Sequence, residues 1–319
     1  MVTPTRMGAG MTMTLSKAVL IEDEFLRDGL QNETRVFSVA EKLAYVQDLI
    51  AAGVKRIQVG SFVHPKWVPT MANTDELCAA LPEAEGVTYT ALVLNGAGLK
   101  RAQAVGLKHL SLSVSASETH SRKNTNRSID EGRAAMATVI EAALADGIAV
   151  RAGIQSALGC GFEGKIDPAV VVSIAKQWSA LGVDEINLAD TAGLANPVQV
   201  ADLCARVRDA IAPEVALSLH LHDTRGLGMA NMLAGLQAGV RVFDTALGGL
   251  GGCPFIPKAA GNISTEDVAF ALEEMGFESG INWRALRGAV ARAEAQLERP
   301  LPGRMGHIFQ PGEAQENAA

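Results

Sequence analysis

Residues 168–190, PAVVVSIAKQWSALGVDEINLAD, contain one complete unit of the architecture that we expect for this chain. Apolar residues recur at helical spacing over 168–181, Gly182 follows, and a short apolar run occupies 184–188. Glycine readily takes the left-handed conformation that ends a helix and turns the chain into the next strand. A short apolar strand next to an amphipathic helix is typical of a parallel sheet that is covered by crossover helices.

The same unit recurs along the chain. Gly53, Gly106, Gly147 and Gly239 each stand between a predicted helix and the strand that follows it. The predicted strands lie near residues 18–24, 55–61, 87–94, 108–114, 148–154, 184–188, 216–222 and 241–246. The predicted helices lie near 38–52, 73–81, 96–105, 128–146, 168–181, 197–210, 226–238 and 265–275. Eight strand–helix units without a long linker predict an α/β fold, a closed (β/α)8 TIM barrel.

We expect one domain to account for most of the chain. The barrel is predicted over residues 18–300, with an additional C-terminal helix near 278–298. Residues 1–17 lack the continuous apolar segment of a secretory signal, so a flexible N-terminal extension is predicted there. Residues 301–319 are predicted to form a C-terminal tail.

Composition excludes several classes of protein. Of 319 residues, 48% are hydrophobic and 20% are charged, and no apolar run has the length of about 18 residues that a membrane-spanning helix needs. The formal charge of −7 provides no general positive field for nucleic acid, so we expect neither a nucleic-acid nor a membrane partner. The cysteines show no paired metal spacing, which favours a reducing compartment and a cytoplasmic location. They are Cys78, Cys160, Cys204 and Cys253.

A dense polar run, RDGLQNE at 27–33, follows the first predicted strand. In a TIM barrel, functional side chains gather at the C-terminal ends of the strands, where all the strand–helix loops open on one face. Arg27, Asp28 and Gln31 are therefore candidates for the site. The alternative is a solvated loop that caps a helix.

The seventh predicted strand ends in two histidines separated by one residue. A period of two places His220 and His222 on one face of the strand and Leu219 and Leu221 on the other. Two neighbouring imidazoles that point inward are costly to desolvate without partners, and a divalent metal would satisfy both. A nitrogen and oxygen ligand set favours Mg2+ or Mn2+, with Zn2+ as an alternative. A pair of hydrogen-bonded core histidines is the competing interpretation.

A glycine-rich loop, GGLGGCP at 248–254, follows the eighth predicted strand. Four glycines in five residues leave few conformational restraints, so the loop is a candidate lid. Cys253 in such a loop could act as acid, base or nucleophile. The alternative is that Cys253 is an incidental small residue.

The order and spacing of several segments resemble the 3-hydroxy-3-methylglutaryl-CoA (HMG-CoA) lyase family. This family lies within the metal-dependent lyase and synthase TIM barrels, and the resemblance spans roughly residues 19–300. The segments are RDGLQNE at 27–33, SFVHPKWVPTM at 61–71, SVSASETHSRKN at 113–124, LADTAG at 188–193, HLHDT at 220–224, GLGGCPF at 249–255 and AAGN at 259–262.

The resemblance implies a carbon–carbon lyase that cleaves a 3-hydroxyacyl-CoA, most simply HMG-CoA to acetyl-CoA and acetoacetate. It implies a divalent metal as cofactor, coenzyme A as part of the substrate, and a homodimer. The implied metal ligands are Asp28, His220, His222 and Asn262, and the implied catalytic residues are Arg27, Asp28, His220 and Cys253. The expected substrate-binding residues are Gln31, Gln58, Ser61, Lys66, Lys123, Asn187, Asp190 and Arg225.

The chain also departs from the family pattern at the active face. Gln58 stands where the family usually has Glu, Phe25-Leu26 replaces Gly-Pro, Asn187 replaces Ser and Arg225 replaces Tyr. The acyl group of the substrate can therefore differ, with citramalyl-CoA or a longer branched ester as alternatives. A non-catalytic CoA-ester-binding protein is the alternative from another class. A 4-hydroxy-2-oxo acid aldolase is disfavoured by the cysteine loop.

Overall fold

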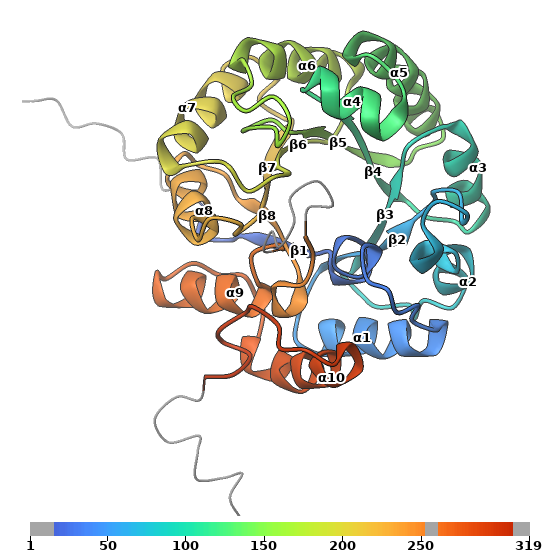
Figure 1. Ribbon diagram of the computed structural model, residues 1–319, viewed down its shortest axis with the longest axis vertical. Helices are drawn as coiled ribbons and strands as arrows, with labels where there is room; N and C mark the ends of the chain where they lie inside the picture. Colours follow the sequence, from blue (N-terminus) through green and yellow to red (C-terminus); the bar gives the residue numbers. More distant parts are fainter. Residues whose placement is uncertain (1–15, 253–260, 309–319) are drawn as a thin grey trace, which may run out of the picture.

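The computed structural model describes residues 16–252 and 261–308. Eight strands form a closed parallel barrel in sequential order, which confirms the predicted TIM barrel (Figure 1). The strands are β1 Leu20–Asp23, β2 Arg56–Ser61, β3 Thr88–Val93, β4 His109–Ser115, β5 Ala149–Gln155, β6 Glu185–Asp190, β7 Ala216–Leu221 and β8 Val242–Thr245. The barrel closes where β1 pairs in parallel with β8, from Leu20 opposite Val242 to Asp23 opposite Thr245.

The helices form a ring around the strands (Figure 1). They are α1 Val39–Ala51, α2 Thr74–Ala79, α3 Gly96–Ala104, α4 Glu118–Thr125, α5 Ile129–Ala145, α6 Pro168–Leu181, α7 Pro197–Arg208, α8 Gly228–Gln237, α9 Thr265–Glu274 and α10 Arg287–Leu297. The short helical turns are η1 Phe25–Gly29, η2 Pro69–Met71, η3 Leu247–Gly249 and η4 Trp283–Leu286. Within the described ranges, none of these helices is long and apolar enough to cross a membrane.

Local sequence explains where the helices begin and end. Ser38, Ser128 and Asn196 each accept a backbone N–H three residues ahead and form a capping box, which fixes the starts of α1, α5 and α7. Gly182 ends α6 with φ 83°, in the left-handed conformation that the sequence predicts. The remaining predicted helix-ending glycines also have positive φ.

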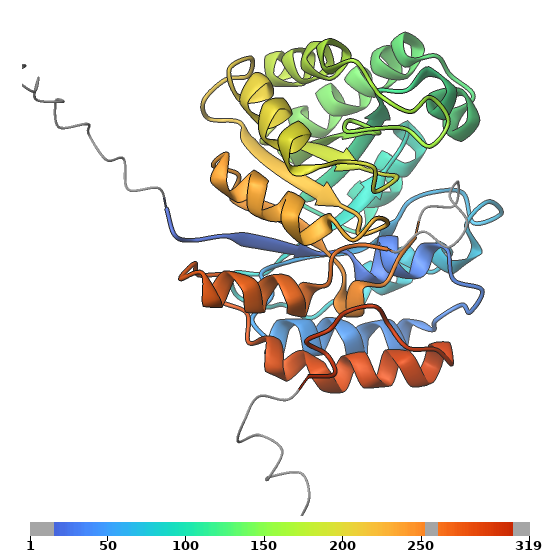
Figure 2. The same ribbon diagram turned by 60° about the vertical axis from the view of Figure 1, so that its left-hand side comes forward.

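Two helical segments differ from the prediction. The polar helix α4 is absent from it, because the sequence ETHSRKNT has no apolar face to reveal a helix; Ser117 caps its start instead. The C-terminal helix is confirmed but begins later than residue 278. Gly280 has φ 72° and η4 intervenes, so α10 starts at Arg287. Figure 2 shows α10 lying along α1, where Arg292 contacts Asp48 and the Tyr45 ring.

Candidate active site and metal centre

The candidate site begins with a single π-helical turn, η1, directly after β1. Phe25 and Leu26 are fully buried, and the Phe25 ring lies 4.6 Å from the Tyr45 ring of α1. This apolar pair fixes the turn, so that Arg27 and Asp28 remain partly exposed at the C-terminal end of the barrel. π-Helical turns are rare and occur frequently at functional sites.

The four predicted metal ligands come together. The Nε2 atoms of His220 and His222 are 3.0 Å apart, and Asp28 Oδ2 lies 4.0 Å from the first and 3.5 Å from the second. The isolated bridge between His222 and Asn262 brings the fourth residue alongside. Asn262 Nδ2 donates to Asp28 Oδ2 at 2.8 Å and to the carbonyl oxygen of Leu250 at 3.0 Å.

This arrangement fits a divalent metal. The ligand atoms of Asp28, His220 and His222 all lie within 4.8 Å of one another. Asn262 Oδ1 is buried and has no hydrogen-bond partner among the described residues, so one more oxygen ligand is available beside them. Gly251 makes room for this group, because a Cβ on Gly251 would lie 2.5 Å from Asn262 Nδ2.

The charge balance in the barrel interior also favours a bound divalent cation. A continuous set of ion pairs joins five carboxylates to three guanidiniums. Its members are Glu22, Glu24, Asp28, Glu185 and Asp244 with Arg27, Arg56 and Arg151. With neutral histidines this charged cluster has two excess negative charges, which are costly to bury. A divalent cation at Asp28 would compensate both.

Asp28 is strongly held in its ionised form. Burial alone would raise the pKa of its carboxyl group, but the Arg27 guanidinium, the hydrogen bond from His222 and the charge of His220 hold that pKa well below its usual range. A carboxylate in this state is a good metal ligand and a weak base.

His220 is oriented by carboxylates behind it. Its Nδ1 lies 3.2 Å from Asp244 Oδ2 and 3.7 Å from Glu24 Oε2, which directs Nε2 toward Asp28. Burial would lower the pKa of His220, but Glu24 and the hydrogen bond to Asp244 raise it. Such outer carboxylates fix the tautomer and the ring orientation of ligating histidines.

Asn187 stands behind His220 rather than at the mouth of the barrel. Its Nδ2 donates to Ser218 Oγ at 2.9 Å and to Asp244 Oδ2 at 3.1 Å. The residue is buried. Its contacts therefore support Asp244, and a direct contact with substrate stays a prediction.

Arg27 is fixed by three neighbours. Its Nη1 donates to Asp28 Oδ1 at 2.5 Å, its Nη2 to Glu24 Oε2 and its Nε to Gln58 Oε1. Burial disfavours the charge, but the carboxylates of Glu24 and Asp28 raise the pKa of Arg27. The side chain is 12% exposed, so a fixed cation faces the open end of the barrel.

Gln58 is fully buried, and its amide is occupied by the protein. Nε2 donates to Glu22 Oε1 at 2.7 Å and to Glu24 Oε1 at 3.0 Å, while Oε1 accepts from Arg27. The amide thus helps to hold Arg27, and both of its N–H groups are used within the protein, so none is available to a substrate.

The remaining predicted substrate-binding residues fall into two groups. Buried Ser61 donates to the carbonyl oxygen of Leu92, and buried Asp190 accepts backbone N–H groups of the loop after β6. Burial raises the pKa of Asp190. The cationic residues Lys66, Lys123 and Arg225 are exposed at the rim. Cys253 lies outside the described residues.

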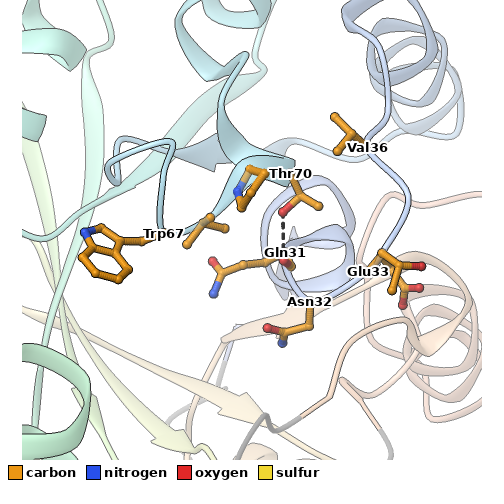
Figure 3. A pocket seen from close by; sticks show the side chains of 9 residues that line it. Gln31, Asn32, Glu33, Val36, Trp67 and Thr70 are labelled. Atoms are coloured by element: carbon orange, nitrogen blue, oxygen red, sulfur yellow. Dashed lines mark hydrogen bonds between the residues drawn. The ribbon is translucent and has the colours of Figure 1, made fainter.

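A surface pocket of about 210 Å³ adjoins the turn that carries Asp28 (Figure 3). Gln31 and Asn32 come from one wall and Trp67 from the other, and Thr70 Oγ1 donates to the Gln31 carbonyl oxygen at 2.8 Å. Within the part of the chain that the structure describes, Gln31 Oε1 is buried without a hydrogen-bond partner. Trp67 is 77% exposed, and Lys66 Nζ lies 5.6 Å from its ring centroid. Trp67 and Gln31 therefore border one space, and Lys66 lies beside the Trp67 ring.

Most of the charged cluster is not among the site residues predicted from the sequence. The missed members are Glu22, Glu24, Arg56, Arg151, Glu185 and Asp244. A signal was present, because an ionisable residue inside an apolar strand must find a buried partner, and Glu22 and Glu24 have the spacing of one strand face. Their partners come from other strands, so sequence alone could not pair them.

Known proteins resemble this chain over nearly all of its length. The family model HMGL-like matches residues 18–291. The hydroxymethylglutaryl-CoA lyase of Pseudomonas mevalonii is 40% identical over 304 residues, covering 94% of this chain and all of that protein. The (R)-citramalyl-CoA lyase of Chloroflexus aurantiacus is 42% identical over 300 residues, covering 91% of this chain and 94% of that protein.

Solved structures agree with this relationship. The structure of an HMG-CoA lyase from Acinetobacter baumannii, in complex with coenzyme A and 3-methylmalate, superimposes with a TM-score of 0.88 at 35% identity. The match covers 96% of this chain and 98% of that one.

Proposed function

The chain belongs to the HMGL-like family and is a carbon–carbon lyase, and on this premise we propose that it cleaves a 3-hydroxyacyl-CoA with the help of Mg2+ or Mn2+. HMG-CoA, giving acetyl-CoA and acetoacetate, is the first candidate substrate. The observation that carries the proposal is the convergence of Asp28, His220, His222 and Asn262 beside the fixed cation Arg27.

The proposed reaction breaks the bond between C2 and C3 of the thioester. The 3-hydroxyl group loses its proton and becomes a carbonyl group, and the bonding electrons pass to the acyl-CoA fragment as an enolate that then takes up a proton at C2. A bound divalent cation supplies Lewis acidity that lowers the pKa of the hydroxyl group.

Arg27 stabilises the negative charge that develops on the thioester oxygen. Its guanidinium remains charged at every physiological pH and is already fixed by its neighbours, so little reorganisation is needed during the reaction. Asp28 and His220 are the candidates for accepting the hydroxyl proton. Of these two, Asp28 is the weaker base because its pKa is held low.

Cys253 is the proposed acid that protonates the enolate carbon. The described part of its loop supports this role, since Asn32 Nδ2 lies 3.5 Å from the Gly252 carbonyl oxygen, one residue before Cys253. Gly252 is thereby connected to the turn that follows Asp28.

Citramalyl-CoA is the second candidate substrate, and one comparison favours it. The relative with 42% identity is a citramalyl-CoA lyase, a level of identity similar to that of the HMG-CoA lyase from Pseudomonas mevalonii. The product would then be pyruvate instead of acetoacetate. We propose that the pocket beside Gln31 and Trp67 takes part in choosing between such esters.

A direct test incubates the purified protein with Mg2+ or Mn2+ and a panel of 3-hydroxyacyl-CoA esters, and detects the products by mass spectrometry. We expect acetyl-CoA together with acetoacetate or pyruvate. His220→Ala and Cys253→Ala should each reduce turnover by orders of magnitude with the fold intact by circular dichroism. Near-normal rates in both variants would refute the assigned roles.

We further propose a cytoplasmic location and a homodimer. The location is supported by Cys78, Cys160 and Cys204, which are free and buried in the structure. Detection of the protein in fractionated cells tests the location. Light scattering of the purified protein tests the dimer.

A further inference from the structure

The barrel interior contains a carboxylate, Glu24, that the proposed mechanism does not use. It is fully buried and lies between the end of β1 and the turn η1. Oε1 accepts from Arg151 Nη2 at 2.8 Å and from Gln58 Nε2 at 3.0 Å, and Oε2 accepts from Arg27 Nη2. Glu24 therefore contacts two arginines and one amide, and its Oε2 also lies 3.7 Å from His220 Nδ1.

The surroundings of Gln58 permit only one orientation of its amide. Nε2 lies within hydrogen-bond distance of two carboxylate oxygens, from Glu22 and Glu24, and Oε1 faces the Nε–H of Arg27. The reverse orientation would place the amide oxygen against two anions and the amide NH2 group against a donor. The Gln58 amide thus connects Glu22 and Glu24 with Arg27 in one fixed orientation.

We infer that Glu24 and Gln58 form one interdependent positioning pair, in which a charge at residue 24 and a neutral amide at residue 58 together hold Arg27. This inference rests on the proposed function, because Arg27 is the group that meets the substrate there. The pair contacts Arg27 from the residue that follows β1 and from β2, so neither residue fixes the guanidinium alone.

The charge count explains why the two residues depend on each other. A carboxylate at residue 58 would face the oxygens of Glu22 and Glu24 and would add one negative charge to the cluster beyond the two that a divalent cation would compensate. The Arg27 guanidinium would then be attracted toward the carboxylates of residues 24 and 58 and away from the substrate. With glutamine at residue 24 as well, the total charge is restored and the new carboxylate gains an amide donor.

A double-mutant cycle on the full-length protein tests this pair. The variants are Glu24→Gln, Gln58→Glu and the exchanged double variant, assayed for kcat, KM and Mn2+ affinity by titration calorimetry. We expect each single variant to lose about 10- to 100-fold in kcat, and Gln58→Glu to bind Mn2+ at least as tightly as the parent because its added charge is negative. The double variant should recover at least about 10-fold over the worse single variant.

Gln103→Glu is a matched control. Gln103 Nε2 also donates to a carboxylate, that of Asp146, but on an exposed surface, so this change brings two carboxylates together away from the site. We expect kcat and Mn2+ affinity to stay within about 2-fold of the parent, since exposed charges interact weakly.

The pair is refuted if the losses of the two single variants simply multiply in the double variant, or if Gln58→Glu turns over normally. If Gln58→Glu does not fold, Gln58→Met removes the amide without adding charge and should still lower kcat; unchanged kcat in that variant refutes the inference. If the parent cleaves no CoA ester, the proposed function fails. In that case the same double-mutant cycle is measured on the free energy of unfolding. If the changes in that free energy are additive in the double variant, the interdependence of Glu24 and Gln58 is refuted independently.

Discussion

The two halves of the active face are built differently. On the side of η1, β7 and β8, every predicted metal ligand and Arg27 is held by neighbours, and Glu22, Glu24, Arg151 and Asp244 form a buried support. On the rim formed by the segments that follow β2 and β4, Lys66, Lys123 and Trp67 are exposed. The fixed side suits a reaction whose chemistry does not vary, and the exposed rim suits the choice of substrate. Each of the following tests acts on one side of this division.

Removal of a metal ligand should have the largest effect. His222→Ala leaves a buried cavity and removes one nitrogen from the ligand set, so we expect at least about a 1000-fold loss of kcat/KM, and weaker Mn2+ binding measured by calorimetry. Retained Mn2+ affinity would show that the cation binds elsewhere.

Two buried carboxyl groups, those of Asp23 and Glu266, should make the stability of the protein depend on pH. Burial raises the pKa of Asp23 and that of Glu266 to about 7 each, although hydrogen bonds from Thr265 and from the Gly248 N–H oppose this. Both groups take up protons on folding above about pH 4. Their contribution is therefore present at low pH and is lost as the pH rises toward 7.

Glu266→Gln keeps an acceptor for Gly248 and cannot ionise. Above pH 7 we expect this variant to be more stable than the parent, by on the order of 3 kcal/mol at most. Thermal unfolding at pH 5 and pH 8 measures the difference. A difference that is equal at the two pH values would contradict the assignment.

Removing the charge of Asp244, which orients His220, should reduce kcat and Mn2+ affinity less than removing a metal ligand does. Asp244→Asn keeps the shape but removes the charge that faces His220 Nδ1 and Arg151, so we expect about a 10- to 100-fold loss of Mn2+ affinity and of kcat. Asp202→Asn on the exposed face of α7, where the carboxylate also pairs with an arginine, is the control. Equal effects of both changes would argue against an orienting role.

The exposed rim should give the smallest effect, and on a different parameter. Trp67→Ala should raise KM about 3- to 10-fold and leave kcat nearly unchanged. The reason is that the indole lines the pocket and is exposed, whereas His220, His222 and Asn262 are buried. Val198→Ala, at an equally exposed position of α7, should change neither parameter. A fall in kcat for Trp67→Ala would place the rim within the chemistry.

Much of this division could be predicted from the sequence. The glycines between helices and strands predicted the barrel, and the topology of a barrel then predicted that residues 28, 220 and 222 lie at one end. Asn262 was added to this set only by the family resemblance. These inferences work because they depend on local backbone conformation and on strand order.

The support of the site could not be predicted in the same way. The roles of Glu24 and Gln58 depend on which side chains meet across the barrel, and this follows from strand register, for example Glu22 opposite Arg56. The π-helical turn η1 was also missed, since one turn has no periodicity to detect. The sequence places Gln58 among the expected substrate-binding residues, and in the structure its amide contacts Arg27 and two carboxylates.

The closure of the barrel between β1 and β8 has a consequence for folding. The ligands at residues 28 and 262 are brought together only when the first and last strands have paired, across more than two hundred intervening residues. No partly folded chain that lacks this late, long-range pairing contains the complete site. A tightly bound cation would therefore favour the native state by mass action, and its release would report the opening of the first strand.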